Sequence, residues 1–298
     1  KKGDHLMDRR QFLKMGAAAS GLALAPNPLE KVYAAEVEQE FVGVLVDTTR
    51  CIGCRRCEQA CAKANGLPIP NIKDESVLKT IRTTDTEAWT VVNRYHTGKG
   101  LVSVKRQCMH CNQPGCTTAC LVNAMLKKKA GPVIWQASKC MGCRYCMVSC
   151  PFDVPKFEYH KAIPTIQKCN FCFERQRKGQ IPACVEACPV DALMFSSRRN
   201  VVENAHSRIA AKPDQYYHHI YGETEVGGTG WLYLANVPFD QIGFKTDLGI
   251  TPYPEYTKMF MYLDPVVFVL WTSLLMGLHY ITRTNKNAAD KNSEAKEH

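Results

Sequence analysis

The chain has 298 residues, a hydrophobic fraction of 45% and a formal net charge of +10 at pH 7. This length allows one large or two small domains, and nucleic acid is not an expected partner because the lysines and arginines are scattered rather than aligned in a stripe. The unusual feature is the set of sixteen cysteines, an even number that allows disulfides, zinc sites or iron–sulfur clusters.

The first 34 residues predict an export signal of the twin-arginine (Tat) type. Arg9 and Arg10 open the stretch RRQFLK, which leads into the weakly apolar run MGAAASGLALA, and VYA at 32–34 suits a cleavage site. The alternative is an ordinary arginine pair at the start of an amphipathic helix. The Tat interpretation predicts that the protein folds in the cytoplasm and then crosses to the periplasm.

Four later stretches predict β-strands. Residues 41–50, 101–107 and 131–139 alternate or run apolar, and each leads into a group of cysteines. Residues 86–96 indicate a strand inside an insertion that covers 62–100. Residues 198–258 contain many Gly, Pro and Tyr and no cysteine, so we expect an extension that packs on the rest and leads to the membrane.

The sixteen cysteines fall into four quartets. In chain order these are Cys51, Cys54, Cys57 and Cys61; Cys108, Cys111, Cys116 and Cys120; Cys140, Cys143, Cys146 and Cys150; and Cys169, Cys172, Cys184 and Cys188. The first and third follow C-x2-C-x2-C-x3-C, a spacing typical of bacterial two-cluster ferredoxins, in which three cysteines hold one [4Fe–4S] cluster and the fourth reaches the other. The second and fourth have four or eleven residues before the third cysteine.

Zinc and disulfides are the alternatives to clusters. Paired C-x2-C knuckles are the usual sign of zinc, but all four quartets here end in x3-C, and proline follows two of them. Cysteines so close together in tight loops bridge each other poorly, and the chain is long enough to have a core of its own. A Tat signal also agrees with clusters, because a Tat substrate crosses the membrane folded, with its cofactors inserted.

Residues 259–282 predict a transmembrane helix. About 23 mostly apolar residues, at a rise of about 1.5 Å each, approach the roughly 30 Å thickness of the hydrocarbon layer. Pro265 suits a first helical turn, so the helix proper could begin there, and a buried amphipathic helix is the alternative. The basic residues after it place the tail, 283–298, in the cytoplasm. The body then lies on the outer face, in agreement with the Tat signal.

Two histidines are candidate functional residues. His110, inside the second quartet, could tune a cluster by hydrogen bonding, or it could merely be exposed on its loop. His279, in the predicted membrane helix, invites a haem-ligand interpretation, but an interfacial or packing role is the interpretation we favour. No nucleophile–base pair, glycine-rich phosphate loop or pair of acids stands out, so no catalytic residue is predicted.

These features resemble the four-cluster ferredoxin subunits of membrane-bound oxidoreductases, most closely the iron–sulfur subunit of hydrogenase-2-type [NiFe] hydrogenases. The resemblance covers about 41–282 and is carried by KRQCMHC, CMGCRYCMVSCPFDVPKF, ACVEACPVDAL and YGETEVGGTGWLYLANVPF. It implies an α+β fold with two nested ferredoxin-like modules, insertions and one C-terminal transmembrane helix. The implied four-cluster domain spans 35–258, with an outer module around 41–61 and 165–197, an inner module around 101–157 and the extension 198–258.

The resemblance also implies how the quartets share four [4Fe–4S] clusters. The implied ligand sets are Cys51, Cys54, Cys57 and Cys188 for cluster 1; Cys61, Cys169, Cys172 and Cys184 for cluster 2; Cys108, Cys111, Cys116 and Cys150 for cluster 3; and Cys120, Cys140, Cys143 and Cys146 for cluster 4.

The implied function is electron transfer and not catalysis by the chain alone. We expect a relay between a periplasmic catalytic subunit, a [NiFe] hydrogenase, and a quinone-reactive integral partner in the bacterial inner membrane. The alternatives are the beta subunit of a molybdopterin oxidoreductase or of a cytochrome c-linked transmembrane redox complex. A self-contained redox enzyme is disfavoured because every cysteine is used as a ligand, and a sensor or assembly factor because no DNA-binding or signalling module is present.

Overall fold

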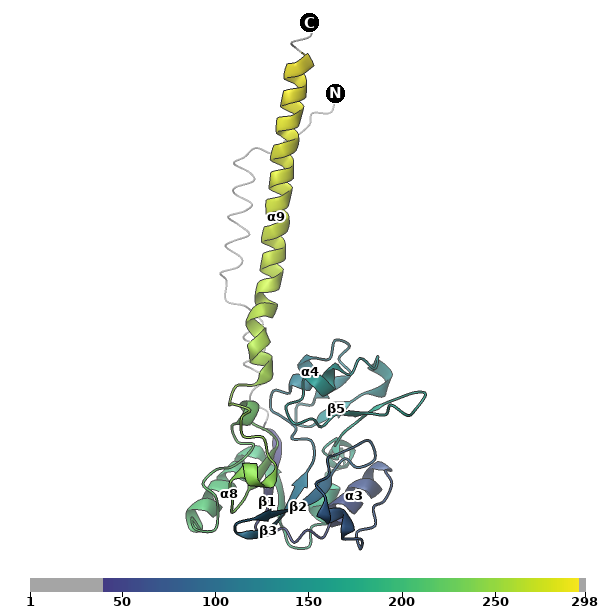
Figure 1. The fold of residues 1–298 in the computed structure, drawn as a ribbon, viewed down its shortest axis with the longest axis vertical. Helices are drawn as coiled ribbons and strands as arrows, with labels where there is room; N and C mark the ends of the chain where they lie inside the picture. Colours follow the sequence, from purple (N-terminus) through teal and green to yellow (C-terminus); the bar gives the residue numbers. More distant parts are fainter. Residues whose placement is uncertain (1–39, 295–298) are drawn as a thin grey trace. The chain divides into compact units, whose positions relative to one another are not determined.

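The structure is a computed structural model that describes residues 40–294, with side chains described from 40 to 283 (Figure 1). The predicted Tat signal lies outside the described residues. The strands form one three-stranded sheet and three two-stranded sheets in the described part of the chain. The strands are β1 (Val42–Asp47), β2 (Val91–Thr97), β3 (Gly100–Arg106), β4 (Met125–Lys127), β5 (Val133–Trp135), β6 (Lys156–Phe157), β7 (Ile166–Gln167), β8 (Leu193–Ser197) and β9 (Trp231–Leu234).

The helices are mostly short. The α-helices are α3 (Arg56–Asn65), α4 (Gly115–Thr118), α5 (Tyr145–Val148), α6 (Phe173–Arg177), α7 (Ala183–Glu186), α8 (Arg198–Ala211) and α9 (Tyr253–Glu294). The 3-10 helices are η1 (Ser76–Lys79), η2 (Ala137–Lys139), η3 (Glu225–Gly227) and η4 (Phe239–Ile242). Helices α3, α4, α5 and α7 each contain at least one cysteine, so these elements position the candidate ligands.

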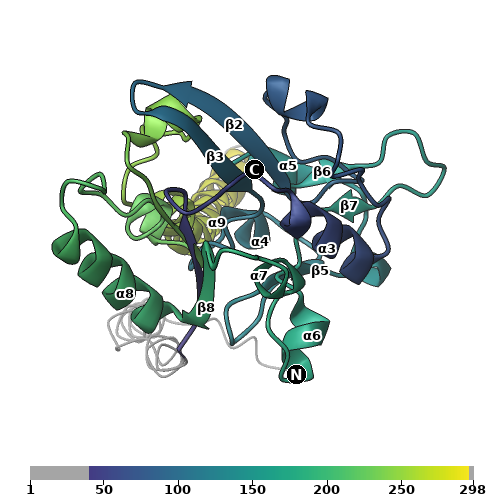
Figure 2. The ribbon, with the colours of Figure 1, turned by 90° about the horizontal axis from the view of Figure 1, so that it is seen from below.

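Strand β1 is the centre of the three-stranded sheet. It pairs antiparallel with β8 and parallel with β9. Both faces of the sheet are covered. On one face Leu45 packs with Val201 and Ala205 of α8, and the other face lies against the main core. Figure 2 shows α8 lying along β8. Ser197 caps α8 by accepting a hydrogen bond from the backbone N–H of Asn200, which satisfies one free donor of the first turn.

Residues 198–258 contribute a strand and buried aromatic side chains to this core. Trp231 of β9 is paired with Val44 of β1 and is fully buried. Tyr221 and Tyr233, from the same region, are also buried in the main core, where they pack edge to face. The sequence predicted a segment that packs on the rest; the structure shows that it supplies a strand of the central sheet.

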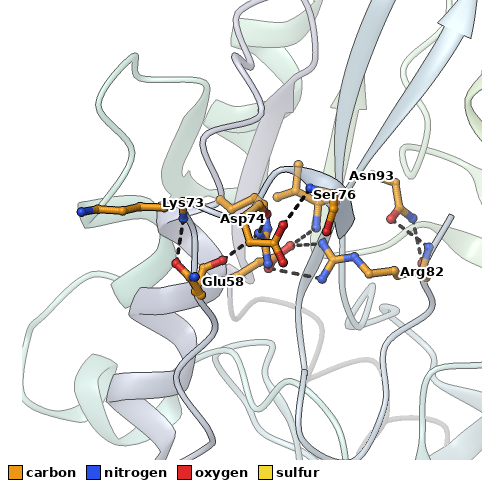
Figure 3. Close-up of polar contacts among 9 residues, drawn as sticks. Glu58, Lys73, Asp74, Ser76, Arg82 and Asn93 are labelled. Carbon is orange, nitrogen blue, oxygen red and sulfur yellow. Dashed lines mark hydrogen bonds and ion pairs between the residues drawn. The ribbon is translucent and has the colours of Figure 1, made fainter. Parts of the chain in front are cut away.

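The strands predicted from sequence are found, with shorter or slightly shifted bounds. The stretch 86–96 forms a strand only from Val91, and the stretch 131–139 forms β5 and then the 3-10 helix η2. The insertion 62–100 is attached to α3 by a buried carboxylate, Glu58, which is 4% exposed. Arg82 of the insertion binds Glu58 at 2.5 Å, and the backbone N–H of Val92 donates to it at 2.6 Å (Figure 3).

Helix α9 begins at Tyr253, earlier than the sequence predicted. Pro265 therefore lies inside the helix and not in its first turn. The stretch Tyr253–Arg283 is long and apolar enough to cross a membrane, and none of its most apolar window is buried within the structure. Against the described residues this window is not buried, as a buried amphipathic helix would be, and its exposed apolar surface suits lipid.

Candidate iron–sulfur centres

The four C-x2-C loops share one backbone feature. In every loop the residue before the second cysteine has a positive φ, and these residues are Gly53 (71°), His110 (49°), Gly142 (73°) and Phe171 (59°). Left-handed residues in tight loops turn successive backbone N–H groups into one concavity, an arrangement found at many anion and iron–sulfur sites. The loops are thus four versions of one local structure, although two of them have different spacings to the third cysteine.

Glycine is required at the first of these positions. A Cβ on Gly53 would lie 2.6 Å from the Oγ of Ser103, in addition to the left-handed backbone. The second and fourth loops place His110 and Phe171 there instead, at a conformational cost on the order of 1 kcal/mol each. These two side chains stack on one another, and this packing offsets the local strain.

Three cysteines of the first quartet and one of the fourth surround a common cavity. Cys51 and Cys54 precede α3, Cys57 lies in its first turn, and Cys188 follows α7. All four thiols line a cavity of about 30 Å³. Burial raises the pKa of the Cys51 thiol, and Cys188 and Cys54 raise it further despite a backbone hydrogen bond from Gly53.

The last cysteine of the first quartet has different neighbours. Cys61 lies one helical turn after Cys57 and is buried. Burial raises the pKa of its thiol, and the proximity of Cys169, Cys184 and Cys172 raises it further. Helix α3 packs against α7, which carries Cys184. The first and fourth quartets therefore meet along these two helices.

The second and third quartets meet in the same way through α4 and α5. Burial raises the pKa of the Cys111 thiol well above its ordinary value, and the proximity of Cys108, Cys150 and Cys116 raises it further. At the other end, the pKa of Cys146 is raised to about 11 by burial and then by Cys140, Cys120 and Cys143.

These neighbourhoods bring the first and fourth quartets together, and likewise the second and third; they also extend across the implied sets, because Cys184 acts on Cys57 as well as on Cys61. The ligand sets themselves remain a prediction, which the neighbourhoods support. Among the residues that the structure describes, no three His, Cys, Asp or Glu side chains converge closely enough to hold a single metal ion.

Backbone and side-chain donors point at the cysteine sulfurs. The Cys120 Sγ accepts from the backbone N–H of Ala124 at 3.1 Å and of Met125 at 3.4 Å, and the Cys169 Sγ accepts from that of Phe171 at 3.4 Å. Burial raises the pKa of the Cys169 thiol to about 12, even with Lys105 opposing the shift. The Cys169 thiol is therefore neutral before metal arrives, and iron binding must release its proton.

His110 provides an independent test of whether clusters fit. Its ring is 1% exposed, so the interpretation of an exposed loop residue is wrong. The backbone N–H of Val133 donates to its Nδ1 at 2.9 Å, and burial holds the pKa of the ring well below its usual range. The neutral ring therefore carries its proton on Nε2. That atom is buried without a partner, and the sulfur of a bound cluster would supply the acceptor it lacks.

Known proteins with similar sequences agree with this chemistry. Residues 101–198 match the model of the 4Fe–4S dicluster domain family. A protein of Nitratidesulfovibrio vulgaris (strain Hildenborough) is 46% identical over 97% of this chain and 81% of its own length. The hydrogenase-2 operon protein HybA of Escherichia coli O157:H7 is 33% identical over 94% of this chain and 96% of its own length. The iron-sulfur subunit of the nitrate-inducible formate dehydrogenase of Escherichia coli K12 is 32% identical over 77% of each chain.

Proposed function

The chain belongs to the family of [4Fe–4S] proteins that includes HybA and the iron–sulfur subunits of formate dehydrogenases, and from this premise we propose that it is an electron-transfer subunit with four clusters. It relays electrons between a periplasmic catalytic subunit, a [NiFe] hydrogenase, and a quinone-reactive partner in the bacterial inner membrane. The two nested modules and the sixteen cysteine ligands predicted from the sequence are part of this proposal.

The observation that carries the proposal is the grouping of cysteines from different quartets. Helix α3 carries Cys57 toward the Cys51 cavity and Cys61 toward Cys169. One helix thus connects two neighbourhoods, and α5 does the same with Cys146 and the Cys150 that follows it. Such sharing sets neighbouring clusters a short distance apart, which a relay needs.

When bound, [4Fe–4S] clusters supply one-electron transfer without proton chemistry. The residues of this chain bind the clusters, keep water away and adjust their potentials. Phe171 and Trp231 are almost completely buried between the loops, and their ring centroids are 5.5 Å apart. The Nε2–H of His110 is available to donate to cluster sulfur, a contact that raises the potential of a cluster.

The second and third quartets mark the membrane-side end of the relay in this proposal. Helix α4 packs against α9, and a Cβ on Gly115 would lie 3.6 Å from the Cβ of Tyr253. Around the same loops, Leu121 (87%), Val148 (82%) and Met141 (64%) are strongly exposed. Apolar side chains beside a membrane helix suit an integral membrane partner.

The test is to extract the full protein from membranes with mild detergent and identify the subunits that co-purify. We expect a [NiFe] subunit pair and about four [4Fe–4S] clusters by iron and acid-labile sulfide analysis, with cluster reduction by hydrogen. A molybdopterin subunit with reduction by formate would establish the alternative partner instead. Tightly bound zinc in place of iron, or turnover by the isolated chain, would overturn the proposal.

A further inference from the structure

Lys105 is a buried lysine without an acidic partner. Its side chain lies in β3 and is 2% exposed, among the most deeply buried large side chains. Its Nζ donates to the Oε1 of Gln107 at 2.8 Å and lies 4.2 Å from the centre of the Trp231 ring. None of the ion pairs within the described residues joins a carboxylate to Lys105.

The surroundings hold this side chain in one place. The amide of Gln107 donates to the hydroxyl of Tyr233 at 2.7 Å, and that hydroxyl donates to the backbone carbonyl of Lys105 at 3.0 Å. The network therefore closes on itself around the lysine. Its neutral groups satisfy hydrogen bonds, but they do not neutralise the charge.

An isolated buried ammonium is costly, because burial removes its hydration and normally lowers its pKa. Burial does act in that direction on Lys105, but the Cys184 and Cys57 sulfurs, once they are thiolates, raise its pKa above the ordinary value. The groups that can compensate the charge are therefore cysteines. Lys105 also lines the cavity formed by Cys51, Cys54, Cys57 and Cys188.

These cysteines come from two of the proposed ligand sets. The positive charge of Lys105 lowers the pKa of the Cys51 and Cys57 thiols of cluster 1. The same charge lowers the pKa of the Cys61, Cys169 and Cys172 thiols of cluster 2. The charge of Lys105 therefore acts on both sites, and its side chain lines the cavity of the first.

We infer that Lys105 is the shared counter-cation of clusters 1 and 2 and that it raises the reduction potentials of both; this inference rests on the proposed function. Four thiolates leave a [4Fe–4S] cluster negatively charged in both oxidation states, and reduction adds one electron. A fixed positive charge in a dry interior stabilises the reduced form more than the oxidised form. The lysine stays protonated, so one electron moves and no proton is transferred.

The test compares three variants of the full, cluster-loaded protein. K105M removes the charge and keeps the length of the side chain, whereas K105R keeps the charge. K99M is the matched control, because Lys99 is exposed in the turn that joins β2 and β3 of the same hairpin. Iron and sulfide content is measured first, and each cluster is then titrated against potential by electron paramagnetic resonance.

In K105M we expect two of the four clusters to titrate at more negative potentials, with the other two unchanged. K105R and K99M should keep the potentials of the unmodified protein. Unchanged potentials in a fully loaded K105M, or an equal shift in K105R, would overturn the inference.

If K105M assembles no clusters, the potentials measured in K105R provide the test. Potentials equal to those of the unmodified protein support the inference, and shifted potentials contradict it. The proposed function fails separately, if the unmodified protein contains no clusters at all.

Discussion

The imidazole of His110 stacks on the ring of Phe171, with ring centroids 4.7 Å apart and planes 25° apart. The two residues hold the same position in their C-x2-C loops, directly before the second cysteine, and both have a left-handed backbone. One loop belongs to the second quartet and the other to the fourth. The stack therefore joins a loop of the proposed cluster 3 to a loop of the proposed cluster 2.

Replacing His110 by phenylalanine should lower the potential of one cluster. H110F keeps an aromatic ring for the stack but removes the Nε2–H, and hydrogen bonds to sulfur raise cluster potentials. It also leaves the N–H of Val133 without its acceptor, at a cost of about 1–3 kcal/mol of stability. Potentiometric titration should show a more negative potential, whereas H160F, at an exposed histidine, should change nothing. Identical potentials in H110F and the unmodified protein would contradict this role.

Serine substitutions should show that one helix serves two clusters. Cys57 and Cys61 both lie in α3; Cys184 acts on both, but Cys51 acts on Cys57, whereas Cys169 and Cys172 act on Cys61. We expect C57S and C188S to alter the same spectroscopic signal, because both residues belong to the proposed cluster 1. C61S should alter another signal, since its partners are Cys169, Cys172 and Cys184. If C57S and C61S perturb one and the same cluster, the ligand sets are wrong.

Loss of the Glu58 carboxylate should destabilise the insertion 62–100. Arg55 is 3% exposed and binds Glu58 at 3.0 Å, so E58Q leaves a buried guanidinium uncompensated, at a cost of about 3–5 kcal/mol. The control is E75Q, because Glu75 is 73% exposed and its contact with Arg94 is 3.5 Å long; such pairs contribute about 0–1 kcal/mol. Limited proteolysis should cut E58Q faster within the insertion, and equal cleavage of both variants would refute the expectation.

The spacing of the cysteines predicted the local part of the site. Each C-x2-C loop is a short-range structure, so its residue pattern determines its shape, and the strands that lead into the loops were also visible. The pairing of β1 with β9 was missed, because the parallel partners Val44 and Trp231 are far apart in the sequence. No local pattern in 198–258 distinguishes a central strand from a surface extension.

The burial of Lys105 and of His110 was not predicted from the sequence, for a physical reason. Hydropathy assigns a lysine to the surface, whereas Lys105 is buried, with its Nζ 4.2 Å from the centre of the Trp231 ring. The sequence did raise a tuning role for His110, yet could not show that its ring is buried. In both cases the deciding contacts come from Trp231 and Phe171, which follow much later in the chain.

Removal of α9 should release the protein from the membrane without loss of its clusters. A chain ending at Pro252 lacks the apolar stretch Tyr253–Arg283 but retains all sixteen cysteines and the central sheet. Expressed without partner subunits, it should appear in the soluble fraction with unchanged iron content, whereas a chain ending at Arg283 should remain in washed membranes. Membrane retention of the shorter chain would show that another surface binds lipid. Loss of iron would show that the packing of α4 on α9 supports the loops of the second and third quartets, which the exposed position of α9 argues against.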